Sequence, residues 1–236
     1  NSSGTTHIVV PLSEEQARQG LQVTVFCVEK DNEPAVLPDA ALVRSRCFPA
    51  TLPLSNPGLS WQFARALSRT VANFDMVHAH AVWNFPTYYA MRAAHNAGLP
   101  YMVAPQGSFE PWAMQQNRWG KRLYGALTEI PLLNHATFLQ ALTETECKQF
   151  RSYGITAPAT IIPNGVHERM SGPPASRLSE QLGLPAGRRT VLFLSRLHPK
   201  KGVDVLIDAF GELAAVHEDV TLVIAGGDGG TGYGAE

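Results

Sequence analysis

Residues 190–210 constrain the fold of this chain more than any other segment. They contain an apolar run, then a basic loop, then an amphipathic helix. The run has the length of a β-strand and is typical of a strand covered on both faces: Val191, Leu192, Phe193 and Leu194. Apolar residues at helical spacing come next: Val203, Leu206, Ile207 and Phe210. A strand joined to a helix in this way predicts an α/β fold with a parallel sheet.

The loop between that strand and helix carries Arg196, Lys200 and Lys201, with Gly202 at the turn into the helix. Ligands of open α/β sheets bind where parallel strands end, and a helix N-terminus adds free N–H groups and a positive dipole end. The loop is therefore a candidate phosphate site, in which arginine can form two parallel hydrogen bonds. Solvated loop cations are the alternative, because basic loop residues are mostly exposed.

Strand and helix signals alternate along the rest of the chain. We expect strands at 21–28, 76–80, 99–104, 137–141, 160–162 and 220–225, and helices at 60–72, 87–97, 118–133, 143–151 and 177–182. Thr143 followed by Glu146 has the pattern of a capping box. Prolines and glycines interrupt the stretch before residue 190, so we predict a first domain at 1–166, a linker at 167–189 and a second domain at 190–236.

Composition excludes several classes of protein. With 44% hydrophobic residues the 236-residue chain can bury a core, and a net charge of −1 does not favour a nucleic-acid partner. The three cysteines are far apart in the sequence and show no metal or disulfide pattern, which indicates a reducing compartment. No apolar run approaches the ~18 residues of a membrane span, and no signal segment is recognisable.

Three further features have a functional and a structural interpretation. His78 and His80 share one face of a strand, but a third metal ligand is missing, so we expect hydrogen-bonded histidines and no metal. The segment 110–124 contains both tryptophans and cationic residues. This mixture suits a surface that binds an acceptor substrate, a peripheral contact with a membrane, or the ordinary surface of a helix. Glu144 either orients a substrate hydroxyl or stabilises a helix start, and we favour the helix start.

The string SRLHPKKG followed by VDVLIDAF closely resembles the signature of retaining, nucleotide-sugar-dependent glycosyltransferases of family 4. This resemblance implies the GT-B fold, with a Rossmann-like acceptor-side domain followed by a Rossmann-like domain that binds the sugar nucleotide. It implies that Arg196 and Lys201 hold the diphosphate of a nucleoside-diphosphate-sugar donor. No metal and no other cofactor is expected.

The resemblance also assigns residues to the acceptor side. His80 is expected near the reacting carbon of the transferred sugar, and with Arg196 and Lys201 it completes the predicted catalytic set. Gln106 and Gly107 are expected to border the acceptor pocket, with glutamine where relatives often have histidine. Trp112 belongs to the same acceptor-side segment.

Gly4 and Gly227 are the remaining expected donor contacts, and around them the chain departs from the family pattern. Relatives begin with a strand that leads into a Gly-Gly loop, whereas here Ser3 and Gly4 stand almost at the first residue. Pro11 falls awkwardly inside the helix expected next. The pair of glutamates that contacts the donor in relatives is also missing. We therefore expect a fragment that lacks the first strand and most of the C-terminal domain.

The function expected from the resemblance is transfer of a sugar, with retention of configuration, to a glycan or lipid-linked acceptor. Such enzymes commonly build cell-surface polysaccharides and glycolipids, which places this one in the cytoplasm, at the inner face of the membrane. Two alternatives remain. One is a nucleotide-sugar epimerase of GT-B fold, and the other is a fragment that binds without catalysis.

Overall fold

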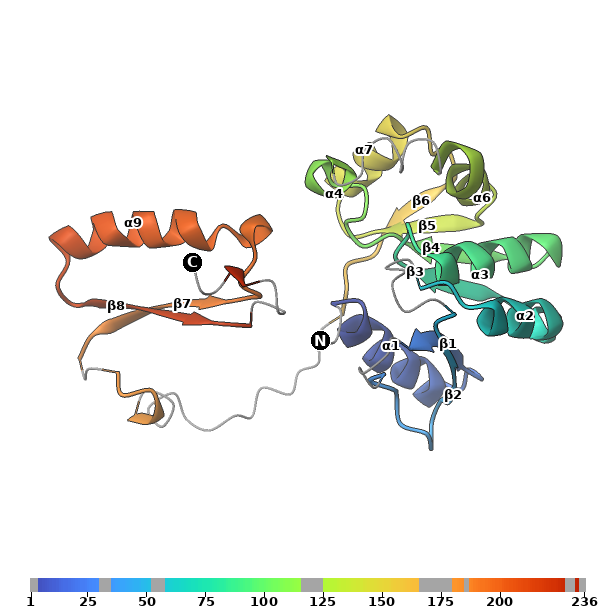
Figure 1. The fold of residues 1–236 in the computed structure, drawn as a ribbon, viewed down its shortest axis with the longest axis horizontal. Coiled ribbons are helices and arrows are strands. Elements are labelled where there is room, and N and C mark those ends of the chain that lie inside the picture. The colour runs from blue at the N-terminus through green and yellow to red at the C-terminus, as the bar shows by residue number, and fades with distance from the viewer. Residues whose placement is uncertain are drawn as a thin grey trace. The chain divides into compact units, whose positions relative to one another are not determined.

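The computed structural model describes residues 4–29, 35–51, 58–115, 125–165, 180–184, 187–227 and 232–233. The chain divides into two compact units, Asn1–His167 and Glu168–Glu236. Each unit has strands covered by helices (Figure 1). The strand pairings of the described residues are all parallel, which confirms the predicted α/β class.

The described residues of the first unit form two sheets. The larger has the order β3–β4–β5–β6, with bounds Val77–His80, Tyr101–Ala104, Phe138–Ala141 and Ala159–Ile161. The smaller pairs β1 (Thr24–Glu29) with β2 (Arg44–Pro49). Because the larger sheet is parallel, its four carboxyl ends lie at one edge, and the loops that follow them meet there.

The helices of the first unit include three that begin at a capping side chain. Their bounds are α1 Thr6–Arg18, α2 Trp61–Thr70, η1 Val71–Asn73, α3 Phe85–Asn96, α4 Pro111–Gln115, the π-helix η2 Gly125–Glu129, α6 Ile130–Asn134 and α7 Glu144–Ser152. Ser60, Asn84 and Thr143 accept the cap hydrogen bonds of α2, α3 and α7. Of the helix predicted at 118–133, residues 118–124 lie outside the described residues.

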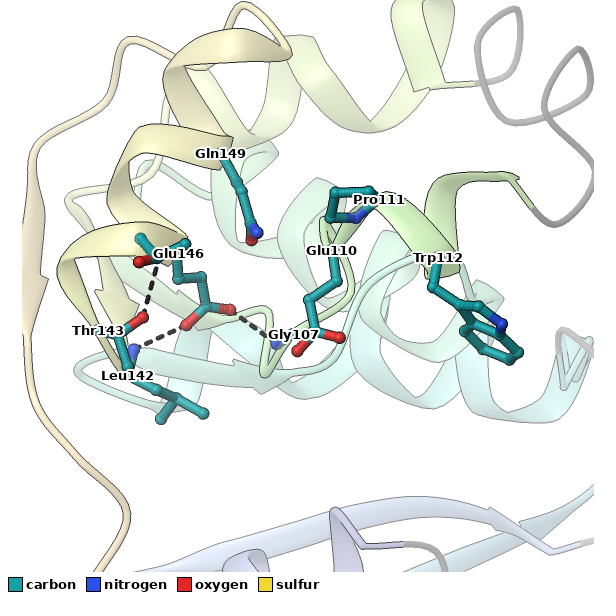
Figure 2. A pocket seen from close by; sticks show the side chains of 9 residues that line it. Gly107, Glu110, Pro111, Trp112, Leu142, Thr143, Glu146 and Gln149 are labelled. Carbon is teal, nitrogen blue, oxygen red and sulfur yellow. Dashed lines mark hydrogen bonds between the residues drawn. The ribbon is translucent and has the colours of Figure 1, made fainter. Parts of the chain in front are cut away.

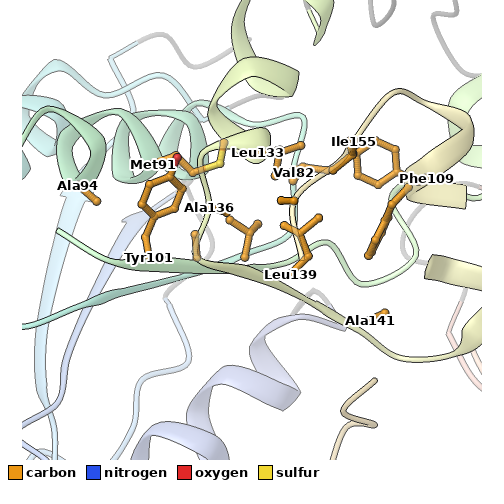
Figure 3. Close-up of a cluster of buried hydrophobic side chains, with 14 of the residues drawn as sticks. Val82, Met91, Ala94, Tyr101, Phe109, Leu133, Ala136, Leu139, Ala141 and Ile155 are labelled. Atoms are coloured by element: carbon orange, nitrogen blue, oxygen red, sulfur yellow. The ribbon is translucent and has the colours of Figure 1, made fainter. Parts of the chain in front are cut away.

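The core of the first unit lies between the four-stranded sheet and the helices that cover it (Figure 3). Its fully buried large side chains include Met91 of α3, Leu133 of α6, Leu139 of β5 and Phe150 of α7. Burial of each such side chain contributes roughly 1.5–3 kcal/mol. The elements that end at the edge of the sheet are thus held rigidly by a common core.

One strand was not predicted, and one predicted helix contains a proline. β2 was not predicted, because Arg44 and Arg46 break the apolar signal: the two arginines are exposed while Cys47 and Phe48 turn partly inward. The helix expected near the N-terminus is present as α1, with Pro11 inside it. A proline there removes one helix hydrogen bond but does not end this helix.

Two of the three cysteines, far apart in the sequence, lie side by side in the structure. Cys27 and Cys47 are register partners on β1 and β2, and their sulfur atoms lie 2.7 Å apart. Both are free thiols. A separation of 20 residues concealed this pair, because parallel pairing joins positions that no local pattern connects.

The second unit contains β7 (Arg189–Leu194), the short helix η3 (Pro199–Lys201), α9 (Val203–Val216) and β8 (Val220–Ala225). The expected coverage of β7 on both faces is wrong, since Leu192 is 57% exposed and Leu194 is 77% exposed. Ile207, expected on the buried face of the helix, is 51% exposed. The reason is that α9 covers one face of the two-stranded sheet, and alternate strand residues point to the opposite face.

Among the helices that the structure describes, none combines the length and the apolar composition needed to cross a bilayer.

Candidate functional site

Two predicted site residues meet at the carboxyl edge of the four-stranded sheet. His80 is the last residue of β3, and Gln106 follows the end of the neighbouring β4. The Gln106 side-chain nitrogen lies 3.2 Å from Nδ1 of His80. The two residues are adjacent because β3 and β4 are parallel neighbours that end together.

Both histidines of the β3 motif are partly desolvated. Burial, with the charge of nearby His78 as a second cause, lowers the pKa of His80 to about 3, and burial lowers the pKa of His78 to about 4. Their rings lie 4.0 Å apart. Both are therefore neutral near pH 7, where His80 can donate or accept a hydrogen bond but carries no charge.

A pocket of about 540 Å³ opens between the loop after β4 and the start of α7 (Figure 2). Its lining consists of Gly107, Glu110, Pro111, Trp112, Leu142, Thr143, Thr145, Glu146 and Gln149. Gly107 and Trp112, which the sequence placed on the acceptor side, thus line one pocket. An aromatic ring among carboxylate, hydroxyl and amide groups suits a polar ring-shaped ligand.

Gly107 has a φ of +77°, in the left-handed region that favours glycine. Its neighbour Gln106 also has a positive φ, 54°, which is strained for a residue with a side chain. Strain of this kind persists only where surrounding contacts hold the backbone in place.

Glu146 supplies such a contact, and the sequence did not reveal it. Its carboxylate is almost fully buried and accepts hydrogen bonds from the backbone N–H groups of Gly107 and Leu142, both at 2.7 Å (Figure 2). The capping-box expectation holds for Thr143, whose Oγ1 accepts from the N–H of Glu146. In a capping box the Glu146 carboxylate would accept the backbone N–H of Thr143. Here it accepts the N–H groups of Leu142 and of Gly107, which lies 39 residues away in the sequence.

In the second unit, the loops after β7 and β8 lie against each other. The N–H of Leu197 donates to the carbonyl of Gly227 at 3.0 Å. A Cβ on Gly226 would lie 1.7 Å from the carbonyl oxygen of Ser195, so only glycine allows this approach. Arg196 therefore stands beside the loop that contains Gly227, and its side chain is exposed.

The other predicted donor residues have fewer contacts. Lys201 is exposed at the end of η3, and Gly202 turns the chain into α9 with a φ of 64°. Gly4 is exposed in the turn before α1, with no heavy atom within 4 Å of the position of a Cβ. Within the described parts of the chain, no three His, Cys, Asp or Glu side chains come together as a metal site requires.

Comparison with known proteins adds two family matches. Residues 3–165 match the family described as Glycosyl transferase 4-like domain, and residues 175–234 match Glycosyl transferases group 1. A D-inositol 3-phosphate glycosyltransferase from Jonesia denitrificans is 28% identical over 98% of this chain and 59% of its own length. A phosphatidyl-myo-inositol mannosyltransferase from Mycobacterium leprae is 25% identical over 94% of this chain and 57% of its own.

Two solved structures have a similar fold. A glycosyltransferase from Rickettsia africae superposes with a TM-score of 0.52 at 13% identity, over 88% of this chain and 69% of that one. A putative UDP-N-acetylglucosamine 2-epimerase from Listeria monocytogenes gives 0.51 at 12% identity, over 86% of this chain and 62% of that one. The chain spans less than two thirds of the length of the two curated relatives.

Proposed function

The chain belongs to the glycosyl transferase 4-like family, and from this membership we propose that it takes part in moving a sugar from a nucleoside-diphosphate-sugar to an acceptor hydroxyl. We propose that the anomeric configuration is retained, as the SRLHPKKG signature implies. The family matches over residues 3–165 and 175–234 are the observation that carries this proposal, and the pocket of about 540 Å³ in the first unit offers space for an acceptor.

The donor side of the proposal rests on the second unit. The exposed cations Arg196 and Lys201 precede the N-terminus of α9, and the glycine loop after β8 packs beside the first of them. Two cations and the positive end of a helix suit a diphosphate. The resemblance assigns the same two residues to the donor.

Bond cleavage explains why cations are needed. As the bond between the sugar carbon and the leaving oxygen breaks, negative charge builds on the β-phosphate. Groups that already point at this charge stabilise the transition state more than the ground state. The loss of one such cation costs ~3 kcal/mol, or ~10²-fold in rate. We propose that the leaving phosphate accepts the proton of the acceptor hydroxyl.

The acceptor side rests on the first unit. We propose that neutral His80, with Gln106 against its ring, contacts the transferred sugar, and that the neighbouring pocket takes a polyhydroxylated ring. The names of the two curated relatives refer to acceptors that contain inositol, and inositol is a polyhydroxylated ring. A glycan or a lipid-linked sugar has the same chemistry, and a role in glycolipid or cell-surface polysaccharide synthesis is part of the proposal.

Calorimetric titration of the chain with UDP-, GDP- and ADP-sugars tests the donor assignment. We expect Arg196→Ala and Lys201→Ala each to weaken binding at least about ten-fold, because each removes a charge-assisted contact. Arg188→Ala is the matched control, since Arg188 is an exposed arginine just before β7, at the opposite end of that strand from Arg196. Equal binding by all three variants would reject the donor site.

An acceptor assay separates transfer from epimerisation. A glycosylated product together with released nucleoside diphosphate supports transfer. An epimerised sugar without a glycosylated acceptor would support the epimerase alternative. Binding of the sugar nucleotide with neither product would describe a chain that binds without catalysis.

A further inference from the structure

A second buried carboxylate, that of Glu129, lies behind the candidate site and none of the roles assigned above uses it. Glu129 is the last residue of η2 and its exposed fraction is 0%. Its oxygens accept the backbone N–H of Trp83, Oε2 at 2.9 Å and Oε1 at 3.1 Å. Within the described residues, no Lys, Arg or His side chain forms an ion pair with it. A buried charge with backbone partners alone is costly, which indicates a specific use.

The backbone that Glu129 holds is strained. Between the end of β3 and the start of α3, Ala81 has a φ of 63° and Trp83 a φ of 65°. Both values are left-handed for residues with side chains, and such backbone strain persists only where surrounding contacts impose it. This turn begins immediately after His80. Its shape therefore sets where the carboxyl end of β3 directs the imidazole.

The same turn reaches the loop that carries Gln106. The indole Nε1 of Trp83 donates to the carbonyl of Ser108 at 3.1 Å, and its ring packs edge-on against Phe109. On the other side, a Cβ at Gly125 would lie 2.7 Å from the indole, so the ring fits only against glycine. Trp83 is thus fixed between the helix that carries Glu129 and the loop at the acceptor pocket.

We propose that Glu129 is a positioning residue, whose carboxylate holds the 81–83 turn and thereby fixes His80 and the 106–108 loop for sugar transfer. It touches no substrate in this proposal and acts through Trp83. The inference rests on the proposed function, because that function gives His80 and Gln106 their roles. A merely structural Glu129 would stabilise the fold without changing the placement of His80.

The ionisation of Glu129 provides a readout that a general loss of stability would not imitate. Burial raises its pKa to about 7, while the N–H groups of Trp83 and Asn84 act in the opposite direction. The nearby groups with shifted pKa values keep their protonation state between pH 5.5 and 8.5, because the pKa values of His78 and His80 are about 4 and 3 and that of Tyr101 is about 12. The double variant His95→Gln with His135→Gln removes the imidazoles of α3 and of the residue after α6.

The experiment is an NMR titration of the whole chain from pH 5.5 to 8.5. We expect the backbone amide of Trp83 to shift with a midpoint near 7, in wild type and in the double histidine variant, and to stay constant in Glu129→Gln. We also expect the His80 ring and the Gln106 side-chain amide to shift in Glu129→Gln, and not in Glu212→Gln, an exposed control on α9. Unchanged His80 and Gln106 signals in Glu129→Gln would overturn the proposal.

Transfer kinetics form the second arm. We expect Glu129→Gln to lower kcat about ten- to hundred-fold with the donor KM unchanged, because small misplacements of reacting groups have effects of this size. A kcat equal to that of Glu212→Gln would overturn the positioning role. If wild type transfers no sugar, the proposed function fails, while the NMR arm still decides whether Glu129 positions His80 and Gln106. The wild-type titration needs no variant, and Glu129→Asp replaces Glu129→Gln if the latter does not fold.

Discussion

Replacement of Glu146 by glutamine should destabilise the first unit strongly. The carboxylate accepts two backbone N–H groups at 2.7 Å in a site where it is 4% exposed. Glutamine keeps one acceptor oxygen and turns an NH2 group toward the other N–H. One bond thus loses its charge assistance, and one buried donor is left facing another donor. Since a hydrogen bond to a charged group contributes ~1.5–3 kcal/mol and an unsatisfied buried group costs ~1–3 kcal/mol, we expect a loss of about 3 kcal/mol.

Urea unfolding followed by tryptophan fluorescence measures this loss. All four tryptophans belong to the first unit, so the signal reports that unit alone. A loss of this size corresponds to a fall in Tm of about 6–12 °C in a unit of this length.

Glu144→Gln is the matched control for this measurement, because Glu144 is exposed in the first turn of the same helix. The control should cost less than ~1 kcal/mol, the scale of an exposed helix-dipole contact. Equal losses in the two variants would refute the argument that the bridge to Gly107 holds the loop.

Three further predictions follow from buried or crowded groups. The pKa of Glu129 is raised from 4.5 to about 7, so its stabilising contribution is complete below pH 4.5 and is lost as the pH rises through 7. We expect a fall of ~3 kcal/mol in the free energy of unfolding across this window, measured with urea, and its absence in Glu129→Gln. Gly226→Ala places a Cβ 1.7 Å from the carbonyl oxygen of Ser195, so it should lower the Tm of the second unit. Circular dichroism measures this Tm, and an unchanged value would contradict the close contact. Burial and the neighbouring thiol of Cys47 raise the pKa of Cys27, so Cys27 should react slowly with a thiol reagent. Mild oxidation with diamide should link Cys27 to Cys47, and mass spectrometry under non-reducing conditions will detect the disulfide.

Local patterns predicted much of the fold. The α/β class, the strands that end at His80 and Ala104, and the helix capped by Thr143 follow from periodicity and capping within about ten residues. The helix predicted from Thr87 begins two residues earlier, at Phe85, because Asn84 caps it. β2 was missed because its exposed arginines have no apolar periodicity.

The candidate site also contains residues that the sequence predicted and residues that only the structure revealed. The resemblance to family-4 glycosyltransferases named His80, Gln106, Gly107 and Trp112, and the structure places the first two within hydrogen-bonding distance. The roles of all predicted site residues, including Arg196 and Lys201, stay predictions. The buried carboxylates behind the loops could not be predicted, because acidic residues in helices are normally solvated.

The sequence by itself determined the family signature, the order of strands and helices and the residue types at the ends of the strands. Only the tertiary structure decided that Glu146 reaches Gly107, that Glu129 holds the turn after His80, and that Cys27 meets Cys47. The physical reason is range. Secondary structure depends on neighbours within a turn or a strand, whereas these contacts join segments 20 to 46 residues apart, brought together only when parallel strands pack side by side.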